Sequence, residues 1–425
     1  MQAIGIDLGT TSICGVAINV ETGLVEKSLT LPNGQFLKGE PFEKLQDPVK
    51  ILNTALRVLT KLLSAQTAAI GVTGQMHGIV YLNKNGKAVS PLYTWQDERG
   101  NLPYRSTTYA KHLNSYSGYG NVTDFYNQQN GVRPAQAVSY CTIHDYFVMQ
   151  LCGLKAPVIH ATNAASFGCY DLEDNRFTYP YSPKIVTDYS VAGLYKGVPV
   201  GVAIGDNQAS AFSTLANENS ILLNVGTGSQ VSVITKNKIA SPNLECRPYF
   251  ENKYLACGAA LCGGRAFALL KGFYAEILTA AGANTDDVYK IMEKFAAAAE
   301  NSELTVDARF AGTRADPTVC GSIGGITCSN FTPQNLTLAF LQGMALELYN
   351  LYEQMGVKRQ GIVGSGNGIR KNKALQKAFE NKFRAKMLLP YHLEEAAFGA
   401  ALFGLISAGV FQNAAQAQKL IRYKA

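Results

Sequence analysis

The sequence predicts an α/β protein built from two related lobes, and three observations lead to this prediction. A strand followed by a turn rich in glycine and threonine occurs at Ile4–Ser12 (IGIDLGTTS) and again at Ile221–Ser229 (ILLNVGTGS). Apolar strands alternate with segments of helical periodicity along the chain. The 425 residues are also too many for one ordinary domain. A repeat spaced by about half the chain length indicates two lobes rather than a solenoid.

The first turn has the composition of a phosphate-binding loop. The backbone N–H groups of Gly9, Thr10 and Thr11, with two hydroxyls beside them, are suited to cradle phosphate oxygens. Asp7, at the end of the strand, is suited to hold a phosphate-bound Mg²⁺, directly or through water. In the second turn Asn224 takes the place of Asp7. An ordinary hairpin turn has the same Asp-x-Gly-Thr pattern, and that interpretation stays open at this point.

The remaining elements follow from periodicity and from turn and cap residues. A helix is predicted after Asp47-Pro48 and another after Thr332-Pro333, because Asp or Thr caps a helix and Pro fits its first position. Strands are predicted at Ala68–Thr73, Val198–Ile204 and Gln360–Val363. The segment Asn101–Gly131, rich in Tyr, Ser, Asn and Gly, is expected to be irregular or to hold small helices, as a lid or a substrate-side insertion. We predict lobes of residues 1–218 and 219–425.

Composition narrows the class of protein. Hydrophobic residues make up 47% and charged residues 16% of the chain, and the net charge of +7 is not gathered into a long basic run, so nucleic-acid binding is not indicated. Nine cysteines and five histidines show no zinc-site spacing, and we expect a reducing cytoplasm. The apolar stretch Ala396–Phe411 is shorter than the ~20 residues of a membrane span. We predict a buried core helix there, in which Gly399, Gly404 and Gly409 allow close packing.

Asp206 is the strongest candidate for catalysis. It follows a buried strand and precedes a helix, where a carboxylate can accept a proton from a hydroxyl that attacks phosphorus. A plain helix N-cap is the alternative, and the two roles are compatible.

Two loops are dense in hydrogen-bonding side chains and are candidates for sugar contact. One is Gly74–Gly78 (GQMHG) and the other is Thr94–Arg99 (TWQDER), which holds the only tryptophan. An indole can stack on the C–H face of a sugar, while polar neighbours address hydroxyls. The alternative makes Trp95 and His77 core residues and Asp97–Arg99 a surface pair.

A third glycine-rich turn, Gly364–Gly368, precedes a helix and suggests a nucleotide, since backbone can approach a ligand closely there. It matches the G-x-G-x-x-G dinucleotide fingerprint poorly, and no P-loop is present. No motif supports a Ser/His/Asp or Cys/His nucleophile. A dehydrogenase is therefore a distant alternative.

Together these stretches resemble the FGGY carbohydrate kinase family, whose fold is that of the actin, hexokinase and Hsp70 ATPase superfamily, with two ribonuclease H-like lobes and a cleft between them. IGIDLGTTS and LNVGTGSQV resemble the phosphate motifs, and VGSGNGIRKN (Val363–Asn372) resembles the adenosine motif. EEAAFGAALFG (Glu394–Gly404) is similar to the closing helix, and IGDNQAS (Ile204–Ser210) to the segment with the catalytic aspartate. TIHDY (Thr142–Tyr146), NAASFG (Asn163–Gly168) and Arg247–Gly264 are most like family members that act on the seven-carbon ketose sedoheptulose.

The resemblance implies an ATP- and Mg²⁺-dependent kinase that phosphorylates the terminal primary hydroxyl of a ketose, with Asp206 as general base. By the same resemblance Asp7 and Asp206 hold Mg²⁺. The implied nucleotide-binding residues are Thr10, Thr11, Gly226, Thr227, Gly264, Gly366 and Asn367. The implied substrate-binding residues are Gln75, Met76, His77, Trp95, Asp97, Asp145 and Asn163. Xylulose, ribulose or glycerol as substrate, and a non-catalytic nucleotide-dependent binding protein, stay open as alternatives. The partners expected are the sugar and ATP, without nucleic acid or membrane, and a homodimer is one option for the oligomeric state.

Overall fold

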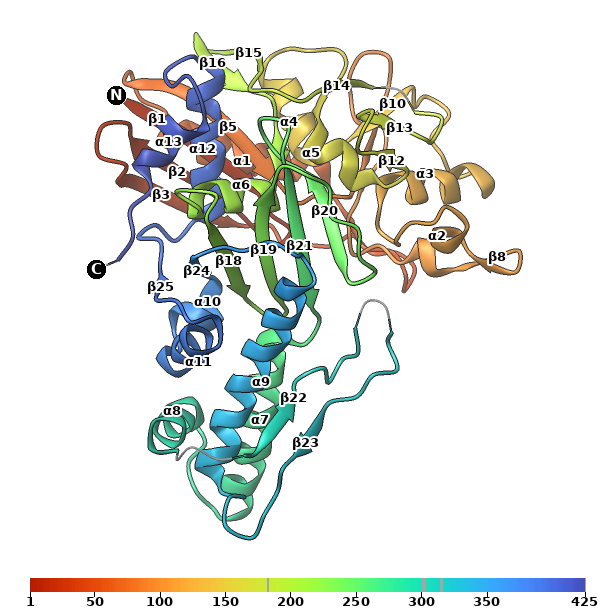
Figure 1. Ribbon diagram of the computed structural model, residues 1–425. Coiled ribbons are helices and arrows are strands. Elements are labelled where there is room, and N and C mark those ends of the chain that lie inside the picture. The colour runs from red at the N-terminus through yellow and green to blue at the C-terminus, as the bar shows by residue number, and fades with distance from the viewer. Residues whose placement is uncertain (182, 300–302, 314–315, 425) are drawn as a thin grey trace. The chain divides into compact units, whose positions relative to one another are not determined.

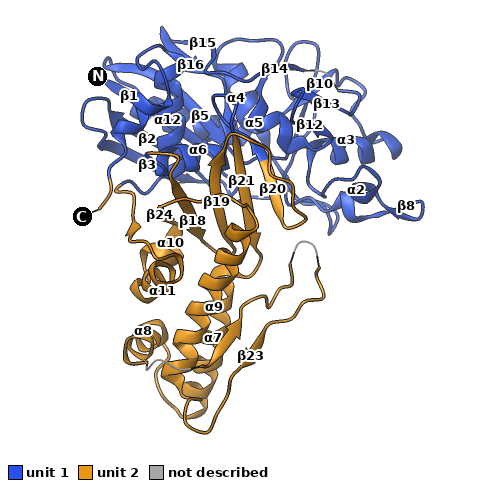
Figure 2. Cartoon of the chain, viewed as in Figure 1, with its two compact units in different colours: residues 1–216, 247–253, 392–422 blue, residues 217–246, 254–391, 423–425 orange. Residues whose placement is uncertain are grey.

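The computed structural model describes residues 1–181, 183–299, 303–313 and 316–424. The chain forms two compact units, drawn in different colours in Figure 2. Unit 1 comprises residues 1–216, 247–253 and 392–422, and unit 2 comprises residues 217–246, 254–391 and 423–425. The chain therefore passes from unit 1 to unit 2 near residue 217 and returns for two shorter segments.

The main sheet of unit 1 is mixed. Its strands are β1 (Gln2–Leu8), β2 (Ser12–Asn19), β3 (Val25–Pro32), β5 (Thr67–Gly74), β15 (Val191–Tyr195), β16 (Val198–Gly201) and β17 (Ile204–Gly205). The order is β15-β16-β5-β1-β2-β3, and β17 pairs with β5. β1 and β2 form the first predicted hairpin, and β1 runs parallel to β5. The helices beside this sheet are α1 (Pro48–Leu62), α6 (Asp206–Thr214) and α12 (Glu395–Ser407).

The main sheet of unit 2 repeats this plan (Figure 1). It contains β18 (Ser220–Val225), β19 (Ser229–Thr235), β20 (Leu244–Pro248), β21 (Tyr254–Ala260), β24 (Gly361–Ser365) and β25 (Met387–Leu388) in the order β20-β21-β19-β18-β24-β25. In both sheets a hairpin strand, β1 or β18, has an antiparallel neighbour on one side and a parallel neighbour on the other. The sheets differ at one edge, because β15 is antiparallel to β16 whereas β25 is parallel to β24. The internal repeat and the α/β class predicted from sequence are confirmed.

The other described elements of unit 2 are helical apart from one antiparallel pair of strands. They are α7 (Gly263–Ala280), α8 (Val288–Ala298), β22 (Thr305–Asp307), β23 (Ser322–Gly324), α9 (Pro333–Glu353), α10 (Gly366–Arg370) and α11 (Lys373–Phe383). Thr332 caps α9 as predicted, because its side chain accepts a hydrogen bond from the Asn335 N–H. α9 packs against β19 and β21 and also contacts α7, α8 and α11, which makes it the centre of this unit's core.

Between β5 and β15, unit 1 contains many short elements. They are β6 (Val80–Leu82), β7 (Leu92–Tyr93), η1 (Arg99–Asn101), β8 (Pro103–Tyr104), β9 (Thr107–Thr108), α2 (Tyr109–His112), α3 (Gly120–Gln129), β10 (Ser139–Cys141), α4 (Ile143–Leu151), β11 (Val158–His160), α5 (Ala161–Ala164), η2 (Ala165–Phe167), β12 (Tyr170–Asp171), β13 (Arg176–Phe177) and β14 (Lys184–Val186). β4 (Leu45–Gln46) precedes α1, and α13 (Ala414–Ala417) and η3 (Gln418–Leu420) follow α12. The Asn101–Gly131 segment thus holds small helices, as expected.

Helices α1 and α12 lie on opposite faces of the unit 1 sheet. Ile6 and Gly15 are cross-strand partners, and a Cβ at Gly15 would touch Val58 and Leu62 of α1. Neighbouring side chains of a strand point to opposite faces. Gly5 accordingly faces α12, where a Cβ would lie 1.7 Å from the Ala397 carbonyl oxygen. Asp7 shares this face with Gly5, so the strand directs it toward the side of the sheet that α12 covers.

The apolar stretch after Glu394 forms α12, and its residues from Ala397 to Ile406 are buried, which confirms the predicted core helix. Gly399 is packed as expected, since a Cβ there would lie 1.9 Å from the Ala209 carbonyl oxygen. The expectation for Gly409 was wrong. It lies in open space just beyond the helix with a φ of +74°, so it terminates α12 rather than packing. Among the described residues no helix is long and apolar enough to cross a membrane.

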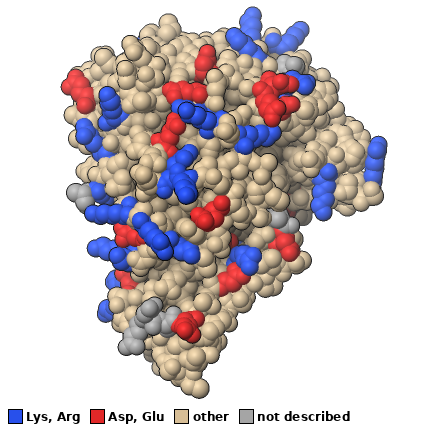
Figure 3. Space-filling model, in the orientation of Figure 1, with Lys and Arg blue, Asp and Glu red and all other residues tan. Residues whose placement is uncertain are grey.

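Charged side chains of both signs are interspersed on the face drawn in Figure 3. On that face the Lys and Arg side chains do not form one continuous basic stripe.

Candidate functional site

Asp7 lies among other carboxylates at the end of β1. Its pKa is raised from 3.8 to about 8, first by burial and then by the nearby charges of Asp206 and Glu394. One oxygen, Oδ1, is shielded from solvent and has no hydrogen-bond partner. A carboxylate kept in such surroundings binds either a proton or a cation.

Asp206 is the first residue of α6, and Gly205 is the N-cap. The alternative that made Asp206 a plain N-cap was therefore wrong. Burial raises its pKa from 3.8 to about 6, while Arg247 and the backbone N–H groups at the start of α6 act in the opposite direction. Asp206 thus stays ionised at neutral pH while its proton affinity is higher than that of an exposed aspartate.

The surroundings of Asp7 and Asp206 fit a divalent cation that keeps much of its own hydration. Hard cations seek carboxylate oxygens, and Mg²⁺ in particular retains several waters and takes further oxygens from phosphates. The orphaned Asp7 Oδ1 supplies one such oxygen. In the described part of the chain no three acidic, histidine or cysteine side chains form a ready-made metal cage. The donor set therefore suits a cation that arrives with a phosphate ligand.

A ring of hydrogen bonds joins the first glycine-threonine turn to the two polar loops. The Thr10 hydroxyl donates to Gln75 Oε1 at 3.3 Å, and Gln75 Nε2 donates to Gln46 Oε1 at 3.0 Å. Gln46 Nε2 then donates to the Thr10 carbonyl oxygen at 2.9 Å. The indole N–H of Trp95 also donates to the Thr10 hydroxyl, at 2.9 Å. Trp95 is 47% exposed, so the core alternative for this residue was wrong.

His77 is held in an unusual conformation. Its φ is +72°, a value that costs energy in a residue with a side chain and that persists only where the surroundings impose it. Its backbone N–H donates to Ser166 Oγ at 3.1 Å, and its Nδ1 lies 2.8 Å from the Ser166 carbonyl oxygen. The ring stacks on Tyr119 with centroids 4.3 Å apart. The neighbouring Met76 is buried.

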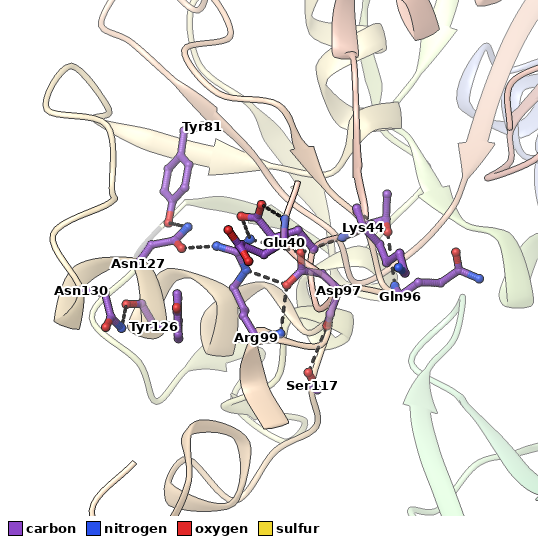
Figure 4. A network of polar contacts seen from close by, with 12 residues as sticks. Glu40, Lys44, Tyr81, Gln96, Asp97, Arg99, Ser117, Tyr126, Asn127 and Asn130 are labelled. Atoms are coloured by element: carbon purple, nitrogen blue, oxygen red, sulfur yellow. Dashed lines mark hydrogen bonds and ion pairs between the residues drawn. The ribbon is translucent and has the colours of Figure 1, made fainter. Parts of the chain in front are cut away.

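Asp97 and Arg99 form a buried ion pair, so the surface-pair alternative was wrong. Arg99 Nε and Nη2 donate to the two Asp97 oxygens at 2.6 and 3.1 Å (Figure 4). Arg99 also donates to Asn127 Oδ1 at 2.5 Å, pairs with Glu43 at 3.2 Å and lies over the Tyr93 ring at 4.4 Å. The Lys44 N–H donates to Asp97 Oδ2. Both carboxylate oxygens of Asp97 are thus engaged within the protein.

Asp145 and Asn163 belong to a second buried network. Asn163 Nδ2 donates to Asp145 Oδ1 and to the Ala203 carbonyl oxygen, both at 3.0 Å. Since that amide nitrogen is the donor, Asn163 Oδ1 accepts from His144 Nε2 at 2.9 Å. Burial raises the Asp145 pKa to about 7 and lowers the His144 pKa to about 4. These side chains fix their neighbours and are closed to solvent.

A hollow of about 750 Å³ borders the exposed side of the TWQDER loop. It is lined by residues of the segment 36–44 together with Trp95, Gln96, Asp97, Glu98, Asn101 and Ser117. The backbone of the segment is fastened to the loop, because the Lys44 carbonyl accepts from Thr94 Oγ1 at 2.7 Å and the Glu98 N–H donates to the Phe42 carbonyl at 2.8 Å. The segment 36–44, which forms one wall of the hollow, is thus held to the TWQDER loop by hydrogen bonds to its backbone.

In unit 2 the two predicted glycine-rich turns and Gly264 lie close together. The Gly264 N–H donates to the Gly226 carbonyl at 3.1 Å, and a Cβ at Gly264 would lie 2.3 Å from that oxygen. Gly366 has a φ of +80°, and a Cβ there would lie 2.5 Å from the Val225 carbonyl oxygen. Thr227, at the exposed tip of the hairpin, accepts the Arg265 N–H at 3.0 Å through its carbonyl. Such backbone-to-backbone contact is open only to glycine.

Asn367 is exposed directly after Gly366, at the start of α10. Beyond α10 a cavity of about 840 Å³ lies between α8, α9 and α11. Lys371, Lys373, Lys377 and Lys382 line it together with small apolar side chains, among them Ala296, Ala339 and Ala374. An apolar surface with a cationic rim suits a base that carries phosphates.

Sequence reasoning missed two charged residues near Asp7 and Asp206. Glu394 raises the Asp7 pKa and Arg247 opposes the rise at Asp206, yet both are more than 30 residues from either aspartate in the sequence. For Glu394 the sequence does contain a clue, because Glu394 and Glu395 form an acidic pair at the start of α12. Arg247 opens a stretch that carries the family resemblance, although no role was predicted for the residue itself, and Gln46 has no local signal in the sequence.

Comparison with known proteins shows which family the chain belongs to. Residues 2–186 match the N-terminal domain of the FGGY family of carbohydrate kinases, and residues 221–408 match its C-terminal domain. Sedoheptulokinases of Mus musculus and Homo sapiens are each 29% identical to the chain, over 94% of it and 96% of the relative. A xylulose kinase structure from Rhodospirillum rubrum superposes with a TM-score of 0.85 at 19% identity, covering 100% of this chain and 93% of the other. The chain belongs to the FGGY family of carbohydrate kinases.

Proposed function

We propose that this carbohydrate kinase transfers the γ-phosphate of ATP to the terminal primary hydroxyl of a ketose, and that sedoheptulose is its preferred substrate. The observation that carries the reaction is the pair of raised-pKa carboxylates, Asp7 and Asp206, at the ends of two strands of unit 1. The relatives named sedoheptulokinase support the substrate, since their similarity extends over nearly the whole chain.

Asp206 acts as the general base. Its carboxylate accepts the proton of the sugar hydroxyl while the hydroxyl oxygen attacks the γ-phosphorus and the bond to the β-phosphate oxygen breaks. In such a loose transition state the base chiefly orients the nucleophile. A pKa of about 6 supports this role, because the group is ionised at neutral pH and still basic enough to take a proton.

Asp7 and Asp206 would hold Mg²⁺ together with the phosphates of the nucleotide. When bound, the ion neutralises charge that develops on the β- and γ-phosphate oxygens. The orphaned Oδ1 of Asp7 supports this assignment. Within unit 1 the hydroxyl of Thr10 is already shared by Trp95 and Gln75, so we assign phosphate contact to the backbone N–H groups of Thr10 and Thr11.

Unit 2 supplies the nucleotide side. We assign Gly226, Thr227, Gly264, Gly366 and Asn367 to the phosphates and the ribose. The close backbone contacts of Gly264 with Gly226 and of Gly366 with Val225 support this assignment, because backbone so exposed by glycine can approach a ligand closely. The nucleoside would extend from α10 toward the lysine-lined cavity beside α11.

The predicted sugar residues divide into two groups. We assign direct contact to His77 and Trp95, because one is held in a strained conformation and the other is exposed. Gln75, Met76, Asp97, Asp145 and Asn163 are buried, and we assign them to the support of these contacts rather than to the sugar itself. The hollow beside Trp95 leaves room for the far end of a long acceptor.

The test uses Trp95, the only tryptophan of the chain. Sedoheptulose, xylulose, ribulose and glycerol are titrated while tryptophan fluorescence is recorded, and ADP release is then measured with Mg²⁺ and ATP present. We expect sedoheptulose to give both the fluorescence change and the highest kcat/KM. A higher kcat/KM for xylulose would change the substrate, and no ADP release with any sugar would favour a non-catalytic binding protein.

The base assignment has its own test. Asp206→Asn should lower kcat roughly 10²- to 10⁴-fold, as loss of a general base does, with little change in nucleotide affinity. Full turnover by this variant would contradict the assignment. Asp174→Asn, at an exposed carboxylate of the same unit, is the matched control.

We also propose that the enzyme works in a reducing cytoplasm, which the nine cysteines support because none of them forms a disulfide in the described residues. Whether it forms a homodimer is decided by light scattering of the purified protein.

A further inference from the structure

Three consecutive residues before Asp206 each have a backbone group bonded to a buried side chain. Asn163 Nδ2 donates to the Ala203 carbonyl at 3.0 Å, and Thr73 Oγ1 donates to the Ile204 carbonyl at 2.8 Å. The Gly205 N–H donates to Thr162 Oγ1 at 3.1 Å. Thr73, Thr162 and Asn163 are 0% exposed. We call these three side chains the polar cradle.

The cradle exists because the sheet supplies little support at this point. β16 ends at Gly201, and β17 contains only Ile204 and Gly205, which pair with the end of β5. Buried peptide groups that lack a ladder partner must find another one. A continuous strand would provide these partners without polar side chains. Here three buried polar side chains take the place of that strand pairing.

Two of the three cradle side chains, Asn163 and Thr162, are themselves oriented by a further contact. Asn163 is held by Asp145 and His144, which determines which way its amide faces. Thr162 lies 2.9 Å from His160 Nδ1, and that nitrogen also accepts the Thr162 N–H at 3.2 Å. His160 Nδ1 is therefore the acceptor, the Thr162 hydroxyl donates to it, and the hydroxyl oxygen is left to accept from Gly205.

We propose that Thr73, Thr162 and Asn163 are positioning residues that hold Asp206 in reach of the acceptor hydroxyl, an inference that rests on the proposed role of Asp206 as base. Gly205 is the N-cap of α6 and Asp206 is the first helical residue, so a shift of the Gly205 peptide moves the carboxylate directly. Displacement of a reacting group by about 1 Å can cost roughly 10²-fold in rate.

Thr162→Val tests the proposal, because it keeps the shape of the side chain and removes the acceptor for Gly205. We expect kcat to fall roughly ten- to a hundredfold with the KM for ATP unchanged, and Thr162→Ser to restore most of the rate. Thr337→Val is the matched control in unit 2: its hydroxyl is equally buried and donates to the Pro333 carbonyl at 2.7 Å. It should lose stability but keep kcat.

A double mutant separates positioning from general loss of structure. If Thr162 acts through Asp206, Thr162→Val should cause no further fall in kcat in the Asp206→Asn background. A kcat within twofold of the parent enzyme for Thr162→Val, alongside an impaired Asp206→Asn, would overturn the cradle and leave the proposed function intact. Full activity of Asp206→Asn would overturn both. Thr73→Val provides the same test at the adjacent peptide if Thr162→Val does not fold.

Discussion

Replacing Asp7 by asparagine should make the metal-free protein more stable and at the same time inactive. In the folded chain the Asp7 carboxylate is kept from solvent at one oxygen and lies near two other acidic groups, Asp206 and Glu394. Asparagine has nearly the same shape and no charge, so it removes the cost of burying an anion there. It also removes the oxygen that we assign to Mg²⁺.

The magnitude follows from the pKa of Asp7. Its rise from 3.8 to about 8 spans about four pKa units, which at about 1.4 kcal/mol each sets an upper limit of roughly 6 kcal/mol. Asp7 is only half-buried as a residue, so solvent screening reduces this figure, and we expect a gain of about 1–3 kcal/mol for Asp7→Asn at pH 8.

The sign of the pH dependence is determined by the direction of the shift. Since the folded-state pKa is raised, folding favours the protonated form, and the stability of the parent protein is undiminished below about pH 4. It falls as pH rises toward about 8 and changes no further through this group above that value. Asp7→Asn lacks this loss, so the difference between the two proteins should grow between pH 4 and pH 8.

The assay is urea unfolding in EDTA, followed by tryptophan fluorescence. Trp95 lies in the same unit as Asp7, so its signal reports the relevant part of the molecule. Asp174→Asn, whose carboxylate is 60% exposed, should show no such gain. Mg²⁺ with ATP should narrow the difference by stabilising the parent protein. A variant less stable than the parent at pH 8, or a difference independent of pH, would refute the reasoning.

Three further predictions follow from the site. The kcat/KM for the sugar should fall about tenfold per pH unit below about pH 6, because burial raises the pKa of Asp206 to about 6 and the base must be ionised. A kcat/KM that stays unchanged down to pH 4.5 would contradict this prediction. Arg99→Met should destabilise unit 1 by about 3–5 kcal/mol in the urea assay, since it leaves the Asp97 carboxylate buried without its partner. Arg99→Lys should recover little, because an ammonium cannot make the forked contact. Gly264→Ala should abolish nucleotide binding measured by calorimetry, because its Cβ would overlap a backbone oxygen. The control is Gly272→Ala, in open space within α7, which should bind nucleotide normally and be more stable by about 0.5–1 kcal/mol.

The sequence predicted the framework of both sheets because the framework depends on local patterns. The two hairpins, the capped helices α1 and α9 and the buried helix α12 all follow from periodicity and from residues adjacent in the chain. The segment Val198–Ile204 was predicted as one strand, yet it is interrupted between Gly201 and Ile204. At the interruption, side chains from distant parts of the sequence donate hydrogen bonds to the backbone. No local sequence pattern predicts these hydrogen bonds.

The same distinction explains the candidate site. Asp97 and Arg99 lie two residues apart, and that spacing gave no sign that Tyr93 and Tyr126 would cover the pair, since Tyr126 comes from the distant helix α3. Burial engages both carboxylate oxygens of Asp97 within the protein, and for this reason we assign the residue to support rather than to direct sugar contact. Long-range burial of this kind is set by tertiary packing, which a single sequence does not display.

Several polar side chains of the two candidate sugar loops contact other protein groups, and this arrangement has an energetic reason. Asp7 and Asp206 destabilise unit 1, because both carry raised pKa values in the folded chain. Strained or repulsive groups persist only where the surroundings over-determine their positions. The ring through Thr10, Gln75 and Gln46 and the ion pair of Asp97 with Arg99 fix the loops of unit 1 that follow β1 and β5 and the TWQDER loop. Substitution of these supporting residues should therefore impair catalysis even though we assign them no contact with either substrate.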